Sequence, residues 1–194
     1  GTSELSIAYG HFAGSGSRDT TGNLNNDTPT RAIYKQYAQI LLAPNDKKFT
    51  FNGTDSDSIY ILNFNRARMR EKIDPGNFEL TMGTLSGSAG VKNSNGLGFS
   101  NAGHTGSAVR LSGLAQWVKV IDDSSTNSAD IGESGQVYNL ISGSIDGGTS
   151  IFNASAPVYY GLLYPQHGVA ILNADSLDAS FPAGVNFNSV TASL

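Results

Sequence analysis

Short apolar runs of strand length, separated by polar stretches, constrain this chain more than any other feature. The apolar run at residues 40–43 is among the longest, and none approaches the roughly 20 residues that a membrane-spanning helix needs. Between these runs lie many of the 23 glycines, together with serine, threonine and asparagine. Such residues mark turns and irregular extended structure. The pattern therefore predicts a mainly β, sandwich-like fold with a minor α component and long Gly/Ser/Asn loops.

The totals exclude several classes of protein. A chain of 194 residues suits one domain or two small ones and can bury a core without covalent staples. It has no cysteine, which excludes disulfides, thiolate metal sites and cysteine catalysis. A net charge of −4 gives no global attraction to nucleic acid or to an anionic membrane.

The length and the C-terminal sequence lead to two expectations about domain organisation. We expect one β-rich structural domain over residues 1–194, with two subdomains divided near residue 110 as the alternative. The sequence ends on Val190–Leu194 without an obvious stop structure. We therefore expect the native chain to continue beyond residue 194.

Alternation of apolar and polar residues predicts seven or eight strands. The clearest are residues 5–12, 59–64, 77–85, 114–121, 137–145, 158–163 and 169–173. The last two are expected to form a hairpin joined by Tyr164–Gly168, followed by a short helix at 173–177. The stretch Asp55–Ser58 is too polar for a core and is expected to be a loop.

One amphipathic helix is predicted after the first strand. Thr28 can cap it, Pro29 suits its first position, and Pro44 ends it. Apolar residues at i, i+4, i+7 and i+8 predict its buried face: Ile33, Tyr37, Ile40 and Leu41.

Two stretches, residues 13–27 and 86–108, consist almost entirely of glycine and small polar residues. The second cannot bury enough apolar surface to order itself. We expect both to be loops or arms that become ordered only against another chain.

A dense basic block stands out in a chain of which only 14% is charged. As a strand, its four cations would all point to one face and form an anion-binding ridge. As a short helix, which Asn65 can cap, they would divide between two sides. We favour the helix, ending near Ile73 because Asp74 must leave the α region before Pro75. The block comprises Arg66, Arg68, Arg70 and Lys72.

The basic block leads directly into Asp74-Pro75-Gly76-Asn77. Proline at the second position and glycine at the third position predict a tight turn. Three roles are open for the block: a solvated helix that redirects the chain, a dock for an acidic protein partner, or a nucleic-acid contact. The last is the weakest, because no aromatic residues lie between the cations.

No catalytic motif is complete, so we expect no enzyme, no metal and no cofactor. The three histidines, His11, His104 and His167, lack zinc-ligand spacing. The acidic pairs Asp55/Asp57 and Asp122/Asp123 could bind calcium, but neither has the ligand spacing of a calcium loop. We expect all four to be solvated loop carboxylates. Trp117 is expected in a core strand rather than as a sugar-binding platform.

Three segments resemble virion structural proteins of large contractile-tailed bacteriophages, especially those that infect marine cyanobacteria. They read IYKQYAQILLAPNDKKFTF, DSIYILNFNRARMREKIDPGNFELTM and VYYGLLYPQHGVAILNADSLD. The resemblance spans about residues 30–180 and implies a non-enzymatic tail, baseplate or neck component with no catalytic residue. The family pattern continues past this C-terminus with another β-rich segment.

The resemblance also implies partners and a place. The partners would be other virion structural proteins and further copies of this chain, without direct nucleic-acid or membrane contact, and the location would be the virion. The assembly contacts would be a rigid corner that docks on acidic groups of an adjoining subunit. Its members are Arg66, Arg68, Arg70, Lys72, Asp74, Pro75 and Gly76.

Composition alone also permits a secreted or cell-surface carbohydrate-binding module or adhesin. Such a module would be a folded monomer with an ordered pocket lined by aromatic residues. A glycan-degrading tail enzyme would need two carboxylates about 5 to 9.5 Å apart.

Overall fold

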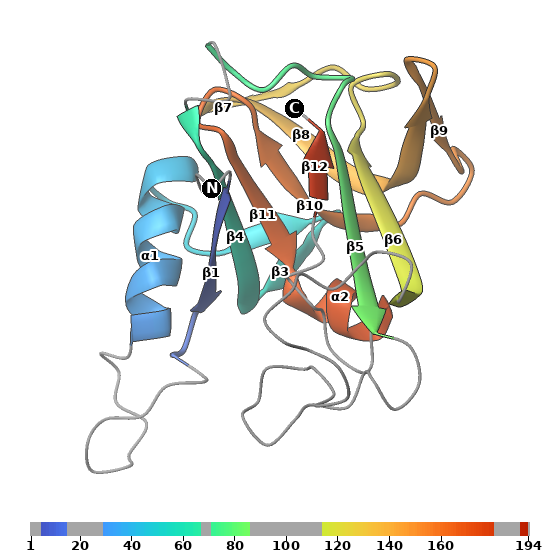
Figure 1. The fold of residues 1–194 in the computed structure, drawn as a ribbon. Helices are drawn as coiled ribbons and strands as arrows, with labels where there is room; N and C mark the ends of the chain where they lie inside the picture. The colour runs from blue at the N-terminus through green and yellow to red at the C-terminus, as the bar shows by residue number, and fades with distance from the viewer. Residues whose placement is uncertain (1–4, 15–28, 67–70, 86–113, 181–190, 194) are drawn as a thin grey trace.

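The computed structural model describes residues 5–14, 29–66, 71–85, 114–180 and 191–193. It shows a strongly curled antiparallel sheet with one helix on its outer side and a short helix at one end (Figure 1). The predicted mainly β, sandwich-like fold with minor α content is confirmed. The elements are β1 (Leu5–His11), α1 (Pro29–Leu41), β2 (Phe49–Phe51), β3 (Thr54–Ser56), β4 (Ser58–Phe64), β5 (Glu79–Leu85), β6 (Leu114–Asp122), β7 (Asp130–Gly132), β8 (Gly135–Asp146), β9 (Thr149–Phe152), β10 (Tyr159–Tyr164), β11 (Val169–Asn173), α2 (Ala174–Ser180) and β12 (Thr191–Ser193).

The main sheet runs in the order β1-β4-β11-β10-β8-β6-β5-β12. Strands β7 and β9 pair with the two ends of the long strand β8, and β2 and β3 form a separate hairpin. The predicted β10–β11 hairpin is confirmed, although β10 includes Tyr164 and the connection is therefore residues 165–168. The number of strands was underestimated, because β2, β3, β7, β9 and β12 are three or four residues long. That length is too short to show a period of two.

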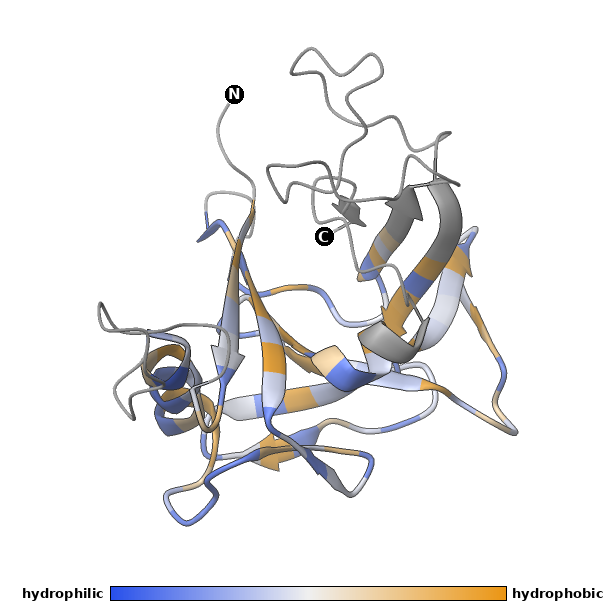
Figure 2. Cartoon of the chain, turned by 90° about the horizontal axis from the view of Figure 1, so that it is seen from below, coloured by the Kyte–Doolittle hydropathy of each residue, from blue (hydrophilic) through white to orange (hydrophobic). Residues whose placement is uncertain are grey.

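The concave side of the curl holds the larger core. Leu62 of β4 and Leu172 of β11 meet Leu80 of β5 and Leu140 of β8 in one buried cluster. The two ends of the sheet therefore pack on each other through their inner faces. The view from below shows α2 across one end of this core (Figure 2), where Leu177 is fully buried. The predicted final short helix is confirmed, with bounds 174–180.

The convex side of β4 and β11 is covered by α1 and β2 in a second cluster. The predicted helix is confirmed, and its predicted buried face is confirmed in part. Leu41 is buried, and Ile33 and Tyr37 are half-buried against the same cluster. The prediction is wrong for Ile40, which is 50% exposed, and it missed Tyr34 and Ala38, which are buried.

Tyr34 is held in the core by its ring and by its hydroxyl. Its ring is buried against Phe49, and its hydroxyl donates to the Ser56 carbonyl (2.7 Å) and accepts from the Phe49 N–H (3.0 Å). Burial raises the pKa of Tyr34 to about 12, so the hydroxyl remains a neutral donor. A buried tyrosine contributes a large apolar area, and its hydroxyl finds hydrogen-bond partners. Ser56, which accepts the hydrogen bond from Tyr34, is itself buried, and Thr54–Ser56 forms β3. The expectation that Asp55–Ser58 is only a polar loop is therefore wrong.

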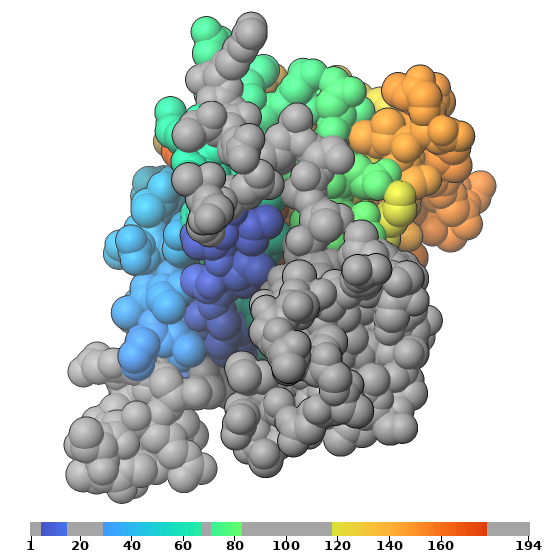
Figure 3. All heavy atoms as spheres, in the orientation of Figure 1, coloured from blue at the N-terminus to red at the C-terminus, as the bar shows by residue number. Residues whose placement is uncertain are grey.

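Strand β1 lies at the surface beside α1 (Figure 3). A Cβ on Gly10 would stand 3.1 Å from the Tyr34 backbone nitrogen, so glycine permits this close approach. At the opposite side of the same view the β8–β9 hairpin extends from the body. Neither helix in the described ranges is long and apolar enough to cross a membrane.

Gly161 is required where β10 approaches β11. A Cβ there would lie 2.2 Å from the Ile171 carbonyl oxygen. We predict that Gly161→Ala lowers the free energy of unfolding by about 3 kcal/mol, in the upper range for overpacking, as measured by urea denaturation. The matched control is Gly132→Ala, where the nearest atom is 3.9 Å away and a change within about 0.5 kcal/mol is expected. Equal effects of the two variants would contradict the prediction.

Glu79 of β5 is bonded to β6 and β8, and its carboxylate makes the stability of the fold depend on pH. Burial alone would favour its neutral form, but hydrogen bonds from Lys119 Nζ (2.8 Å) and the Ile145 N–H (2.8 Å) outweigh it and lower the pKa of Glu79 below its ordinary value. A carboxylate with a lowered pKa stabilises the fold above its unfolded-state pKa, and this contribution is lost as the pH falls through the folded-state pKa.

We therefore expect Glu79→Gln to be less stable than the wild type by about 1–2 kcal/mol at pH 7. The difference should shrink as denaturation is repeated from about pH 5 down to about pH 3. Glu71→Gln, at an exposed position, is the control. A difference that stays constant over this range would refute the assignment.

Candidate functional site

The predicted turn Asp74-Pro75-Gly76-Asn77 is confirmed. The Asn77 N–H donates to the Asp74 carbonyl oxygen (3.2 Å), and Gly76 has φ +87°. A positive φ at the third position is the conformation that favours glycine there. The Asn77 amide also donates to the Asp74 carboxylate. These local contacts close the turn.

A buried carboxylate holds this turn from a distant part of the chain. Both oxygens of Asp122, at the end of β6, accept from the Gly76 N–H at 2.9 Å. One of them also accepts from the Ser124 N–H at 3.2 Å. Asp122 is 1% exposed, so these donors replace the water that its charge would otherwise need.

The next residue, Asp123, is buried in the same way. It accepts from the Asn139 N–H (3.0 Å), the Asn139 amide (2.9 Å) and the Asn127 amide (2.8 Å). The expectation of solvated carboxylates is therefore wrong for Asp122 and Asp123, because backbone and amide donors converge on them. Solvent exposure is confirmed for Asp55 and Asp57. Among the described residues no three acidic or histidine side chains are placed to hold a metal ion.

The residues on both sides of the basic block are anchored on the β10–β11 turn. The Phe64 N–H donates to the Gly168 carbonyl (2.9 Å), and the Ile73 N–H donates to the Pro165 carbonyl (3.0 Å). Ile73 is 1% exposed and belongs to the inner core. The chain therefore leaves and rejoins the body at two fixed points on one turn.

Between these points the structure describes two of the four predicted cations. Arg66 donates to the Gln166 carbonyl (3.3 Å) and Lys72 to the Gln136 side-chain oxygen (3.2 Å), and both side chains remain exposed. Arg68 and Arg70 lie outside the described residues. We call Arg66, Lys72 and the turn at residues 74–77 the basic corner.

The helix predicted for the basic block lies partly outside the described residues. Arg66 has a 3₁₀ conformation, residues 67–70 lie outside the described ranges, and Glu71 and Lys72 lie in a bend. A helix that continues to Ile73 is therefore wrong at its last residues. The Ile73–Pro165 hydrogen bond and the burial of Ile73 set the backbone there instead.

A second hairpin supports the basic corner. The Gln166 side chain accepts from the Gln136 N–H (2.8 Å), and the His167 ring nitrogen contacts the Ser134 carbonyl oxygen at 3.0 Å. The β10–β11 turn and the β7–β8 turn are thus bound together. His167 is exposed, as predicted, and His104 lies outside the described residues.

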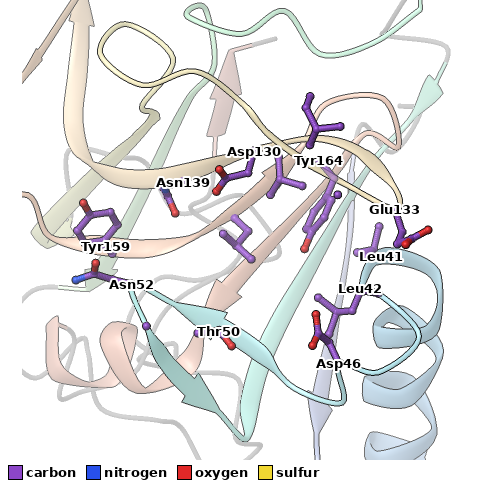
Figure 4. A pocket seen from close by; sticks show the side chains of 16 residues that line it. Leu41, Leu42, Asp46, Thr50, Asn52, Asp130, Glu133, Asn139, Tyr159 and Tyr164 are labelled. Carbon is purple, nitrogen blue, oxygen red and sulfur yellow. The ribbon is translucent and has the colours of Figure 1, made fainter.

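The second candidate site is a cavity of about 510 Å³. One wall comes from the loop after α1 and the β2–β3 hairpin, and the other from β7, β8 and β10 (Figure 4). Its lining within the described residues contains no lysine, arginine or histidine. We call it the acidic cavity, and its polar lining includes Asp46, Asn52, Asp130, Glu133, Tyr159 and Tyr164.

The sequence does contain a signal for one wall of the cavity. Asn52-Gly53 stands between two strand-like pairs, which is the strongest short-range hairpin signal. Both residues have positive φ, 47° and 79°, as a type I′ turn requires. Asp46, Asp130 and Glu133 carry no such signal, because only the fold brings their three elements together. Trp117 lies in β6, as predicted for a strand, and its side chain is outside the described residues.

Comparison of the chain with models of known protein families, with characterised proteins and with solved structures gave no match.

We predict that Asp122→Ala destabilises the protein by about 2–3 kcal/mol, because it leaves the Gly76 N–H without its buried acceptor. The measurement is the midpoint of chemical denaturation. Asp146→Ala removes an exposed carboxylate at the end of β8 and should change stability by no more than about 0.5 kcal/mol. If both variants unfold at the same midpoint, Asp122 does not hold the corner.

Proposed function

We propose that this chain is a non-enzymatic structural subunit of a phage particle, placed in its tail, baseplate or neck or associated with its capsid. It acts through contacts with other virion proteins and with further copies of itself. No catalytic residue is assigned. The resemblance of three segments to phage structural proteins motivates the proposal.

The single observation that carries the proposal is the construction of the basic corner. Arg66 and Lys72 are exposed, yet the backbone beside them is pinned at Phe64, Ile73 and Gly76 by hydrogen bonds to other elements. Cations on a pre-organised backbone lose little conformational entropy when a partner binds. They can therefore select an acidic surface on an adjoining subunit.

The β8–β9 hairpin supports a role in protein contact independently. Ile151 is 53% exposed and Val158, just before β10, is 50% exposed. Within the described residues β9 pairs only with β8, which leaves its second edge open for another strand. Exposed apolar groups beside an open edge are typical of protein interaction surfaces.

Sedimentation of a native lysate tests the proposal first. We expect peptides of this chain to travel with dense, DNA-containing particles at a constant ratio to other particle proteins. Recovery with cell envelopes, or in the soluble fraction alone, would overturn the assignment to a virion.

Charge reversal tests the basic corner. Tagged copies carrying Arg66→Glu and Lys72→Glu, made in the host during particle production, should enter particles at least about tenfold less than tagged wild type. Like charges brought together at an interface cost several kcal/mol, and about 1.4 kcal/mol is tenfold. The matched control is Lys35→Glu with Lys47→Glu, two exposed cations elsewhere. Equal incorporation of both double variants would refute docking through this corner.

A further inference from the structure

The hydroxyl of Tyr164 faces the acidic cavity and forms no hydrogen bond with a described residue. Tyr164 is 2% exposed, and Figure 4 shows its hydroxyl directed into the cavity between the two walls. No hydrogen bond joins this hydroxyl to a described residue, in contrast to Tyr34, whose hydroxyl makes two. A hydroxyl both donates and accepts, and a hydroxyl that opens on a cavity takes its partner from the contents of that cavity.

The charge of the cavity restricts that partner. The carboxylates of Asp46, Asp130 and Glu133 are exposed, and none forms a hydrogen bond or ion pair with a described residue. An anionic ligand would meet three negative charges without a compensating cation, which excludes it. Within the described ranges these carboxylates are also too dispersed to share one metal ion.

The chemistry of the remaining lining favours a ligand with many hydroxyl groups. A hydroxyl both donates and accepts, and this lining offers carboxylate acceptors, the Asn52 amide and the Tyr164 donor. A tyrosine hydroxyl is protonated at neutral pH, and burial raises the pKa of Tyr164 further. The half-buried ring of Tyr159 adds an aromatic surface. The volume of about 510 Å³ lies in the range of small-molecule sites.

We propose that the acidic cavity binds a neutral saccharide, with the Tyr164 hydroxyl donating to it and the Asp130 and Asp46 carboxylates accepting from its hydroxyl groups. This inference goes beyond an assembly role and does not rest on it. A particle subunit and a free binding module could both use the same cavity.

The test uses the purified full chain, four neutral sugars and spermidine as a cationic probe. The sugars are D-glucose, D-galactose, D-mannose and N-acetyl-D-glucosamine. Saturation-transfer NMR, followed by titration, should show binding of at least one sugar. Tyr164→Phe should weaken that binding about fivefold, the size expected for one lost hydrogen bond. Because the hydroxyl has no partner in the described protein, this variant should fold like the wild type. Asp130→Asn should weaken binding by a similar factor.

The matched control is Asp146→Asn, an exposed carboxylate outside the cavity, which should leave affinity unchanged. Binding of none of the four sugars would overturn the proposal, as would binding that Tyr164→Phe and Asp130→Asn leave intact. Binding of spermidine without any sugar would overturn it too, since the cavity would then recognise a cation. None of these results depends on whether the chain is found in particles.

Discussion

Strands β4 and β11 are buried on both faces, and the rest of the structure is arranged around that constraint. Ile61 and Ile171 point to the convex side, while Leu62 and Leu172 point to the concave side. Each fully buried aliphatic side chain contributes about 1.5–3 kcal/mol, so neither face can be left in water. The curl of the sheet covers one face, and α1 with β2 covers the other. The segments that cover the convex face also build one wall of the acidic cavity.

Two adjacent buried carboxylates connect this core to the surface. Asp122 fixes the Gly76 turn and Asp123 fixes Asn139 on β8. An ionised carboxylate is costly to bury unless several donors surround it, and once surrounded it defines the positions of all of them. The basic corner is therefore a rigid extension of the sheet and not an independent loop.

The two proposed surfaces share their support. Tyr164 lines the acidic cavity, and the next residue, Pro165, accepts the hydrogen bond that anchors Ile73. The β7–β8 hairpin likewise carries Asp130 in the cavity and Gln136 at the basic corner. Opposite charges thus stand on two sides of the same pair of hairpins. A chain with a small net charge can in this way offer one surface to acidic partners and another to neutral, hydroxyl-rich ones.

The sequence by itself determined the local features: the mainly β class, α1 from its proline and its apolar spacing, the β10–β11 hairpin, and the turn at residues 74–77. Each depends on residues close together in the chain, where backbone preference and periodicity act directly. Tertiary structure decided which face of α1 is buried, because Tyr34 finds partners in β2 and β3. It also decided that Asp122 and Asp123 are buried, and that three carboxylates and Tyr164 line one cavity. These outcomes depend on pairing between distant strands, and a local pattern carries no information about which donors or walls the fold will bring to a side chain.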